Sequence, residues 1–174
     1  MPNKIIDLYN HTFGHHHKSF DYNQITDEVF IGTNMCCQFG FNRELLTKKV
    51  RADISLEEVR VDAPMGVDYF LWLPTKDHQA PTFDKLTLGV QTLDFLKDKK
   101  IKVYIHCKNG HGRAPTLLAA YFIYASRERS SSRFISQGME VEEAIEKIRS
   151  KRPEIHIRDV QIEALNKFKQ KIGR

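Results

Sequence analysis

The sequence predicts a single α/β domain with a central, mostly parallel, twisted sheet flanked by helices. Short segments rich in β-branched and aromatic residues alternate with segments of helical periodicity along the 174 residues. The strand expected at residues 101–106 leads through a glycine-containing turn into residues 114–125, which are apolar on nearly every side. A helix of that composition is buried, and a strand followed at once by a buried helix is typical of layered α/β folds.

The remaining elements follow from local sequence patterns. Strands are expected at residues 28–32, 52–61, 69–73 and 101–106. Apolar residues at steps of three and four predict helices within residues 83–93, 141–148 and 160–172. Thr82, which follows Pro81, is expected to cap the first of these helices, and the second should end before Pro153. No internal repeat or proline-rich linker marks a domain boundary.

Composition restricts the cellular setting and the partners. The three cysteines, two of them adjacent as Cys36 and Cys37, do not form the framework of a secreted disulfide-rich protein, which favours a reducing compartment. The longest apolar stretch is too short to cross a bilayer, so we expect a cytoplasmic protein with no transmembrane segment. The net charge of +5 suits anionic partners but is too small to indicate nucleic acid, and we expect no nucleic-acid partner.

The stretch VYIHCKNGHGRAPT, residues 103–116, places a cysteine at the start of a tight turn. A strand that ends at Cys107 and a helix that begins near Arg113 direct successive backbone N–H groups into one concavity, which is an anion-binding nest. Glycines in the turn permit the backbone conformations that such a nest requires. We expect the loop to bind a phosphate group through Lys108, Asn109, Gly110, His111, Gly112 and Arg113.

Two residues of this stretch carry specific chemistry. The positive potential of a helix N-terminus beside an arginine favours the thiolate form of a cysteine, so Cys107 is expected to be a nucleophile. Arg113 presents a planar guanidinium that can bind two phosphate oxygens at once, which suits phosphoryl transfer. The spacing of the two residues alone is weak, but the strand, turn and helix around them make the phosphate-binding interpretation strong.

With His106, Cys107, Gly110 and Arg113 in this context, the stretch resembles the signature loop of cysteine-dependent protein tyrosine phosphatases, in particular the small dual-specificity type. Three further segments are similar to parts of that family, namely residues 22–33, 73–82 and 138–153. The resemblance implies a catalytic domain over residues 20–174 with an N-terminal extension at residues 1–19. It also implies hydrolysis of phosphate monoesters through a cysteinyl-phosphate, with no metal and no cofactor.

A phosphatase of this kind needs an acid to protonate the leaving oxygen. Asp77 lies 30 positions before Cys107 in a loop bounded by two prolines, and it matches the family's general-acid aspartate. His78 and Asp84 are weaker alternatives, Asp84 being better explained as a charge in the first helical turn. The resemblance gives His106 the role of orienting the loop, while a plain core histidine explains it equally well.

One residue departs from the family pattern. The family usually has Ser or Thr immediately after the arginine, where its hydroxyl stabilises the departing thiolate, and this chain has Ala114. The phosphatases of regenerating liver carry a similar GRAP run, so activity is compatible with alanine, but we expect slow turnover. Thr116 should bond back to its own helix rather than replace the missing hydroxyl. A catalytically weak phosphate-binding module is therefore an open alternative.

The expected substrates are phosphotyrosine and phosphoserine or phosphothreonine in proteins. A phosphoinositide or another anionic lipid headgroup is the alternative, because lipid phosphatases of the tensin type carry basic residues at the positions of Lys108 and His111. The histidines at positions 11, 15, 16 and 17 are expected to be a solvated run rather than a metal site. Gln161 resembles the water-positioning glutamine of the larger tyrosine phosphatases, but in an amphipathic helix it is expected on the surface. Residues 127–138 are expected to form a polar surface loop.

Overall fold

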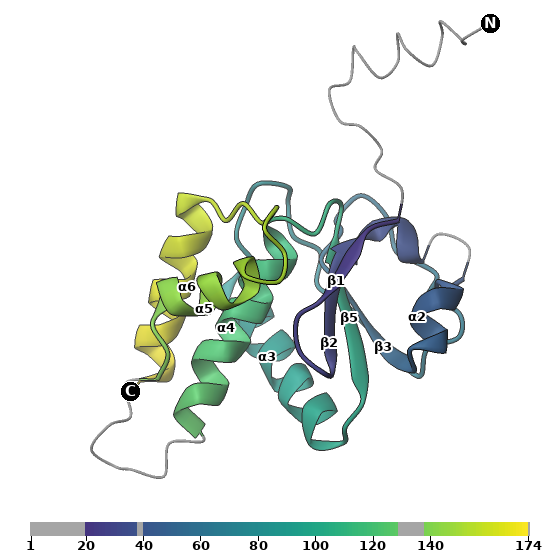
Figure 1. Cartoon of the computed structure of the whole chain (residues 1–174). Coiled ribbons are helices and arrows are strands. Elements are labelled where there is room, and N and C mark those ends of the chain that lie inside the picture. The colour runs from purple at the N-terminus through teal and green to yellow at the C-terminus, as the bar shows by residue number, and fades with distance from the viewer. Residues whose placement is uncertain (1–19, 38–39, 129–137, 174) are drawn as a thin grey trace, which may run out of the picture.

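The computed structural model describes residues 20–37, 40–128 and 138–173. Their core is one five-stranded sheet of order β1-β2-β5-β3-β4 (Figure 1). β1 is antiparallel to β2, and the other three neighbouring pairs are parallel, which confirms the mostly parallel sheet. The strands are β1 (Tyr22–Gln24), β2 (Val29–Thr33), β3 (Val50–Ser55), β4 (Tyr69–Trp72) and β5 (Lys102–Cys107).

Helices cover both faces of the sheet. On one face lie α3 (Phe83–Asp98) and α4 (Arg113–Glu128), and α5 (Val141–Arg149) and α6 (Asp159–Ile172) pack outside α4 (Figure 1). On the other face lie the short α2 (Arg43–Thr47) and the 3-10 helix η1 (Asn34–Cys36). Because both faces are covered, β2 and β5 are buried along most of their length.

The apolar composition of residues 114–125 is explained by the position of α4. This helix contacts β5, α3, α5 and α6, so it has neighbours on nearly every side. Leu117, Leu118, Ala119 and Ala120 have no exposed surface. The buried helix directly after a central strand is therefore confirmed.

The helix ends also agree with the sequence. The Thr82 side chain accepts a hydrogen bond from the Lys85 backbone N–H at the start of α3, as expected for an N-cap. α5 ends at Arg149, before Pro153. The short elements η1 and α2 were not predicted, because three to five residues carry too little periodicity to be recognised.

The strand expected over residues 52–61 is only half correct. β3 begins at Val50 and ends at Ser55, and residues 56–61 leave the sheet. The reason is local hydrogen bonding: the Ser55 hydroxyl accepts the Glu57 N–H at 3.3 Å, and the Glu57 carbonyl accepts the Trp72 indole N–H at 2.7 Å. The chain therefore leaves the strand direction after Ser55, at the carboxyl end of the parallel strands.

Some expectations concern residues outside the described part of the chain. The N-terminal extension with its histidine run, and residues 129–137 of the expected polar loop, belong to these. Within the described residues, no helix combines the length and the apolar character needed to cross a membrane.

Candidate active site

The loop between β5 and α4 occupies the position that the sequence predicts. Cys107 is the last residue of β5 and is 3% exposed, and Arg113 is the first residue of α4. The five intervening residues therefore span the gap between the carboxyl end of a central strand and the N-terminus of a buried helix, which is a favourable place for an anion. Lys108 is exposed at the start of this loop.

The carbonyl oxygens of the loop are turned outward, toward the surrounding protein. The Lys108 carbonyl accepts the Asn34 N–H at 3.2 Å, and the His111 carbonyl accepts the His156 N–H at 2.7 Å. The carbonyls of Asn109 and Gly110 each accept an Arg152 guanidinium N–H at 3.2 Å. In a planar trans peptide the C=O and the following N–H point in opposite directions, so outward carbonyls leave the next N–H groups directed into the loop.

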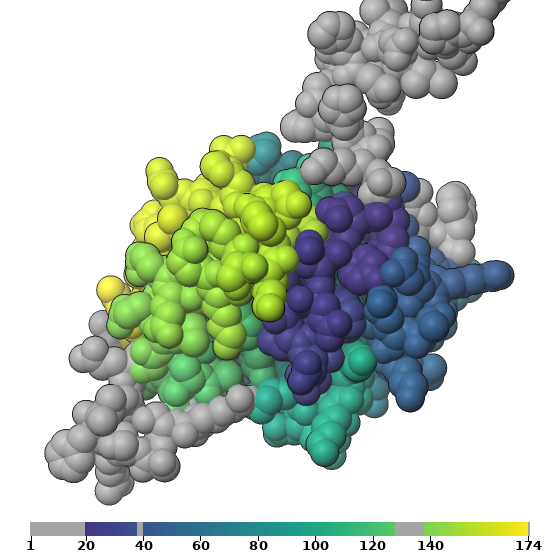
Figure 2. Space-filling view, in the orientation of Figure 1, coloured from purple at the N-terminus to yellow at the C-terminus, as the bar shows by residue number. Residues whose placement is uncertain are grey.

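Arg152 has a role that the sequence analysis missed. Its side chain has no exposed surface, and besides the two loop carbonyls it pairs with Asp21 Oδ2 at 2.9 Å and with Asn23 Oδ1 at 2.5 Å. The segment after α5 lies against the β1–β2 region on the molecular surface (Figure 2). Arg152 therefore links the loop between β5 and α4 to β1 through hydrogen bonds on both sides.

Gly110 fits a position that a side chain cannot occupy. Its φ of +68° lies in the left-handed region, and a Cβ there would approach the Gly32 carbonyl oxygen to 2.4 Å. The glycine at this point, expected from the turn alone, is thus required both by the backbone conformation and by the close approach of β2.

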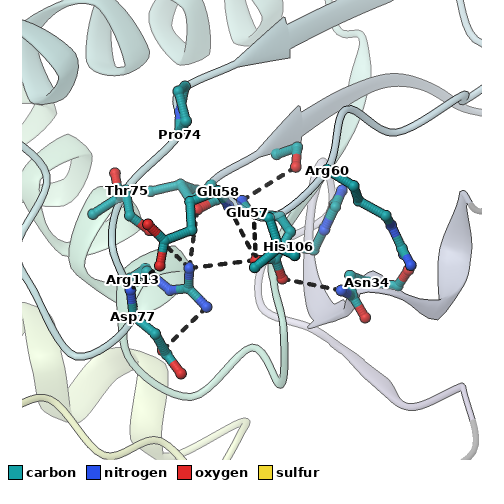
Figure 3. A network of polar contacts seen from close by, with 12 residues as sticks. Asn34, Glu57, Glu58, Arg60, Pro74, Thr75, Asp77, His106 and Arg113 are labelled. Atoms are coloured by element: carbon teal, nitrogen blue, oxygen red, sulfur yellow. Dashed lines mark hydrogen bonds and ion pairs between the residues drawn. The ribbon is translucent and has the colours of Figure 1, made fainter.

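Arg113 is 2% exposed, and its guanidinium contacts two loops, at residues 56–57 and 75–77 (Figure 3). Nη1 donates to the Thr75 carbonyl at 2.8 Å and to the Leu56 carbonyl at 3.3 Å. Nη1 also lies 3.7 Å from Glu57 Oε1. Glu57, which the sequence analysis did not single out, is buried and accepts the Asn34 side-chain N–H at 3.0 Å.

Asp77 is brought to the same site. Its Oδ1 lies 3.1 Å from Arg113 Nη2, and its backbone N–H donates to Glu58 Oε1 at 2.8 Å (Figure 3). The side chain is about half exposed (49%), so it faces the opening of the site rather than the core. Asp84 lies in the first turn of α3 and is exposed, in agreement with the helix-charge explanation.

The expectation that Gln161 lies on the surface is wrong. Gln161 is 1% exposed, its Nε2 donates to the Gln79 carbonyl at 3.0 Å, and its Oε1 accepts the Arg158 N–H at 2.9 Å. A Cβ on Gly112 would lie 3.2 Å from this amide. Gln161 therefore fills the space between residues 108–112, called the phosphate loop from here on, and the loop that carries Asp77. Its amide can be buried because it forms hydrogen bonds with polar groups there.

His106 is completely buried, but its ring lies on the face of the sheet opposite the Cys107 side chain. Cys107 packs with the core under α3 and α4, whereas the His106 ring stacks near Tyr104, which packs with α2 and η1. His106 Nε2 lies 3.3 Å from Asp53 Oδ1 and 3.4 Å from Cys37 Sγ. Burial alone would lower the pKa of His106, but the Asp53 carboxylate outweighs it and holds the pKa well above the ordinary value.

Ala114 is fully buried behind the loop, directly after Arg113. Thr116 is also buried, and its hydroxyl donates to the Gly112 carbonyl at 2.8 Å. The expected bond of Thr116 to its own helix is therefore confirmed.

The fold and this loop define a domain of the cysteine-dependent protein tyrosine phosphatase superfamily, of the dual-specificity type. Residues 35–127 match the family described as "Polymorphic toxin system, DSP-PTPase phosphatase". The chain belongs to this family of dual-specificity-type phosphatases.

Known proteins with similar sequences agree with this assignment. The human "Phosphatidylglycerophosphatase and protein-tyrosine phosphatase 1" is 35% identical over 92 residues, which are 53% of this chain and 40% of that protein. The rat protein of the same name is 36% identical over 93 residues, or 42% of its length. The matched region thus spans about two fifths of these curated relatives.

Solved structures resemble the whole domain. The structure of PTPMT1 in complex with PI(5)P has a TM-score of 0.70 and 30% identity, covering 87% of this chain and 96% of that one. The human tyrosine phosphatase-like serine/threonine/tyrosine-interacting protein has a TM-score of 0.73, covering 88% of this chain and 98% of that one. At 15% identity the second likeness concerns the fold alone.

Proposed function

We propose that this phosphatase hydrolyses phosphate monoesters with Cys107 as nucleophile, Arg113 as phosphate ligand and Asp77 as general acid. The observation that carries the proposal is the outward hydrogen bonding of the carbonyls at residues 108–111, which leaves backbone N–H groups for a phosphate. Donors fixed in advance in this way stabilise the charge of a transferring phosphoryl group without reorganisation.

In the first step the Cys107 thiolate attacks phosphorus. The S–P bond forms as the ester P–O bond breaks, and the leaving oxygen takes the proton of Asp77. The Arg113 guanidinium and the loop N–H groups bind the equatorial oxygens during the transfer. The contact between Asp77 and Arg113 supports this assignment, because it places the acid beside the phosphate-binding group.

In the second step water attacks the cysteinyl-phosphate. A new P–O bond forms, the S–P bond breaks, and Asp77 takes the proton of the attacking water. The buried amide of Gln161 lies between the two loops, where it can hold the position of the loop that carries Asp77. Neither step requires a metal ion or an organic cofactor.

The first candidate substrates are phosphotyrosine and phosphoserine or phosphothreonine side chains of proteins. The dual-specificity character of the family supports this choice, as does the protein-tyrosine phosphatase part of the relatives' name.

A lipid headgroup monoester is the second candidate. The phosphatidylglycerophosphatase part of the same name supports it, and so does the PI(5)P complex of the similar structure. The chain itself adds two features. Lys108 is exposed at the loop entrance, and Val59 and Val61 are 85% and 59% exposed in the segment whose Glu58 binds the Asp77 amide. Exposed apolar side chains near a basic site suit contact with an anionic lipid surface.

Two measurements test the mechanism and the substrate. With p-nitrophenyl phosphate, the Cys107→Ser variant should lose turnover while still binding vanadate or phosphate, and undiminished activity would refute the mechanism. Phosphate release is then compared between phosphopeptides and vesicles that contain phosphatidylglycerophosphate or PI(5)P. A kcat/KM for peptides at least about tenfold higher supports the protein assignment, a reversal supports the lipid assignment, and the Cys107→Ser variant is the blank for both.

A further inference from the structure

A second cluster of reactive side chains lies on the opposite side of the sheet from Cys107. It consists of Cys36 at the end of η1, Cys37, Asp53 on β3 and His106 on β5, and all four residues are buried. One donor atom from each lies within 4.8 Å of the others. The chain therefore brings two thiols, a carboxylate and an imidazole together at a point where the mechanism uses none of them.

Several polar atoms of this cluster have no hydrogen-bond partner among the described residues. Both carboxylate oxygens of Asp53 and Nδ1 of His106 are buried without one. His106 Nε2 lies 3.3 Å from Asp53 Oδ1, within ion-pair distance, but the pair does not have hydrogen-bond geometry. A buried carboxylate whose two oxygens accept no hydrogen bond is incompletely compensated for the loss of water, even beside a charged imidazole. A metal cation bound by the cluster would supply the missing contact to the carboxylate.

Two of the distances between donor atoms match those of a tetrahedral metal site. Metal bonds of about 2.0 Å to nitrogen and oxygen and 2.3 Å to sulfur give ligand-to-ligand separations of about 3.3–3.8 Å. His106 Nε2 lies 3.3 Å from Asp53 Oδ1 and 3.4 Å from Cys37 Sγ, within this range. The two sulfurs, 2.6 Å apart, must separate by about 1 Å for both to bind one ion.

The donor set also selects the kind of ion. Two thiolates with one imidazole and one carboxylate suit Zn²⁺, which accepts sulfur, nitrogen and oxygen ligands in a tetrahedron, and they do not suit Mg²⁺ or Ca²⁺. Four protein ligands leave no open position, which is the arrangement of a structural rather than a catalytic site.

We propose that Cys36, Cys37, Asp53 and His106 bind one Zn²⁺ ion that fixes η1, β3 and the end of β5 to one another. On binding, each thiol forms an S–Zn bond and releases its proton, His106 releases a proton from Nε2 and binds through that nitrogen, and the Asp53 carboxylate completes the tetrahedron. Because His106 directly precedes Cys107, the ion holds the strand end from which the phosphate loop begins.

Cobalt titration of the metal-depleted, reduced full chain tests the proposal. Co²⁺ in a tetrahedral thiolate site gives a thiolate-to-metal absorption band, and we expect about one ion per chain, displaced by Zn²⁺. Cys37→Ser and Asp53→Asn should weaken binding on the order of 10–100-fold or more. Cys107→Ser serves as the matched cysteine control and should keep the band. A variant with His11, His15, His16 and His17 all changed to alanine tests for binding by the N-terminal histidines and should keep the band.

Thermal unfolding gives a second readout, which does not depend on the variants folding normally. Added Zn²⁺ should raise the unfolding midpoint of the unmodified chain and a chelator should lower it, since an ion that binds only the folded state stabilises it. Three results would overturn the proposal. The first is an unfolding midpoint that does not change with added zinc, and the second is a cobalt band that is lost when the histidine run is changed but kept in Cys37→Ser. The third is a protein mass lower by two hydrogens, which would show that Cys36 and Cys37 form a disulfide.

Discussion

Arg113 Nη2 lies 3.1 Å from Asp77 Oδ1, so the proposed phosphate ligand and the proposed general acid are in direct contact. The same guanidinium donates to the Thr75 carbonyl at 2.8 Å, two residues before Asp77. Arg113 therefore binds the loop that carries the acid at two points, the Asp77 side chain and the Thr75 backbone carbonyl. One buried group at the end of the phosphate loop thus contacts the acid loop directly.

The first prediction concerns Asp77. Asp77→Asn removes the proton donor and should lower kcat by about 10²–10⁴-fold, the usual contribution of general acid–base catalysis. The loss should be larger for phenyl phosphate than for p-nitrophenyl phosphate, because the poorer leaving group needs the proton more. Steady-state assays with both esters measure this difference. Asp84→Asn is the control and should leave both rates unchanged, and equal losses for the two esters in Asp77→Asn would contradict the acid role.

The central part of the site could be predicted because its determinants are local in sequence. Cys107, the glycine-containing turn and Arg113 follow one another within seven positions, and the flanking strand and helix have clear periodicity. The chemistry of this unit depends on backbone direction and helix potential, which the local pattern specifies. The same holds for Thr82, whose capping role is fixed by its neighbours.

The groups that hold the site in place could not be predicted in this way. Arg152 is separated from Gly110 by 42 positions, and Gln161 from Gln79 by 82 positions. Nothing in the sequence separates buried Arg152 from its exposed neighbour Lys151, because both are basic residues after the same helix. The burial of Arg152 and Gln161 depends on which backbone carbonyls, distant in sequence, the fold brings to their side chains.

The second prediction concerns Arg152. Arg152→Met keeps much of the side-chain volume but leaves the carbonyls of Asn109 and Gly110 and the Asp21 carboxylate without their donor. We expect the free energy of unfolding to fall by about 1–3 kcal/mol, the cost of leaving a buried carbonyl without its donor, while the Asp21 side chain is 38% exposed and can be hydrated. The kcat should fall as well, because the loop loses the bonds that turn its carbonyls outward. Urea unfolding and phosphatase assays measure the two effects.

The control for this change is Arg149→Met, three positions earlier on the exposed end of α5. Within the described residues Arg149 forms an ion pair with Glu146 on the surface, and a surface pair contributes at most about 1 kcal/mol. If Arg152→Met proved as harmless as Arg149→Met, its hydrogen bonds to the loop would have no energetic importance.

The third prediction concerns Gln161. Gln161→Leu removes the hydrogen bond from the buried amide to the carbonyl of Gln79, an exposed residue. Such a hydrogen bond contributes about 0.5–1.5 kcal/mol, so we expect the acid loop to leave its position more often and kcat to fall roughly 2–10-fold. Gln170→Leu, on an exposed turn of the same helix, should not change the rate. A rate loss shared by both variants would indicate a general effect on α6.

The fourth prediction concerns Ala114, the residue directly after Arg113. It has no hydroxyl to stabilise the Cys107 thiolate as that thiolate leaves the phosphorus, so the second step should limit the rate and the cysteinyl-phosphate should accumulate. Ala114→Ser supplies a hydroxyl to the buried position behind the loop. We expect a faster second step, by roughly tenfold if the new hydrogen bond to the charged sulfur contributes about 1.4 kcal/mol.

Rapid-quench measurements with p-nitrophenyl phosphate separate the two steps. The unmodified chain should release a burst of p-nitrophenol before the steady state, and Ala114→Ser should reduce the burst and raise kcat. Ala119→Ser places a hydroxyl on the same buried helix, and it should leave the kinetics of both steps unchanged because it follows Arg113 by more than one turn. If the unmodified chain shows no burst, the first step limits turnover, and the alanine after Arg113 does not slow this enzyme.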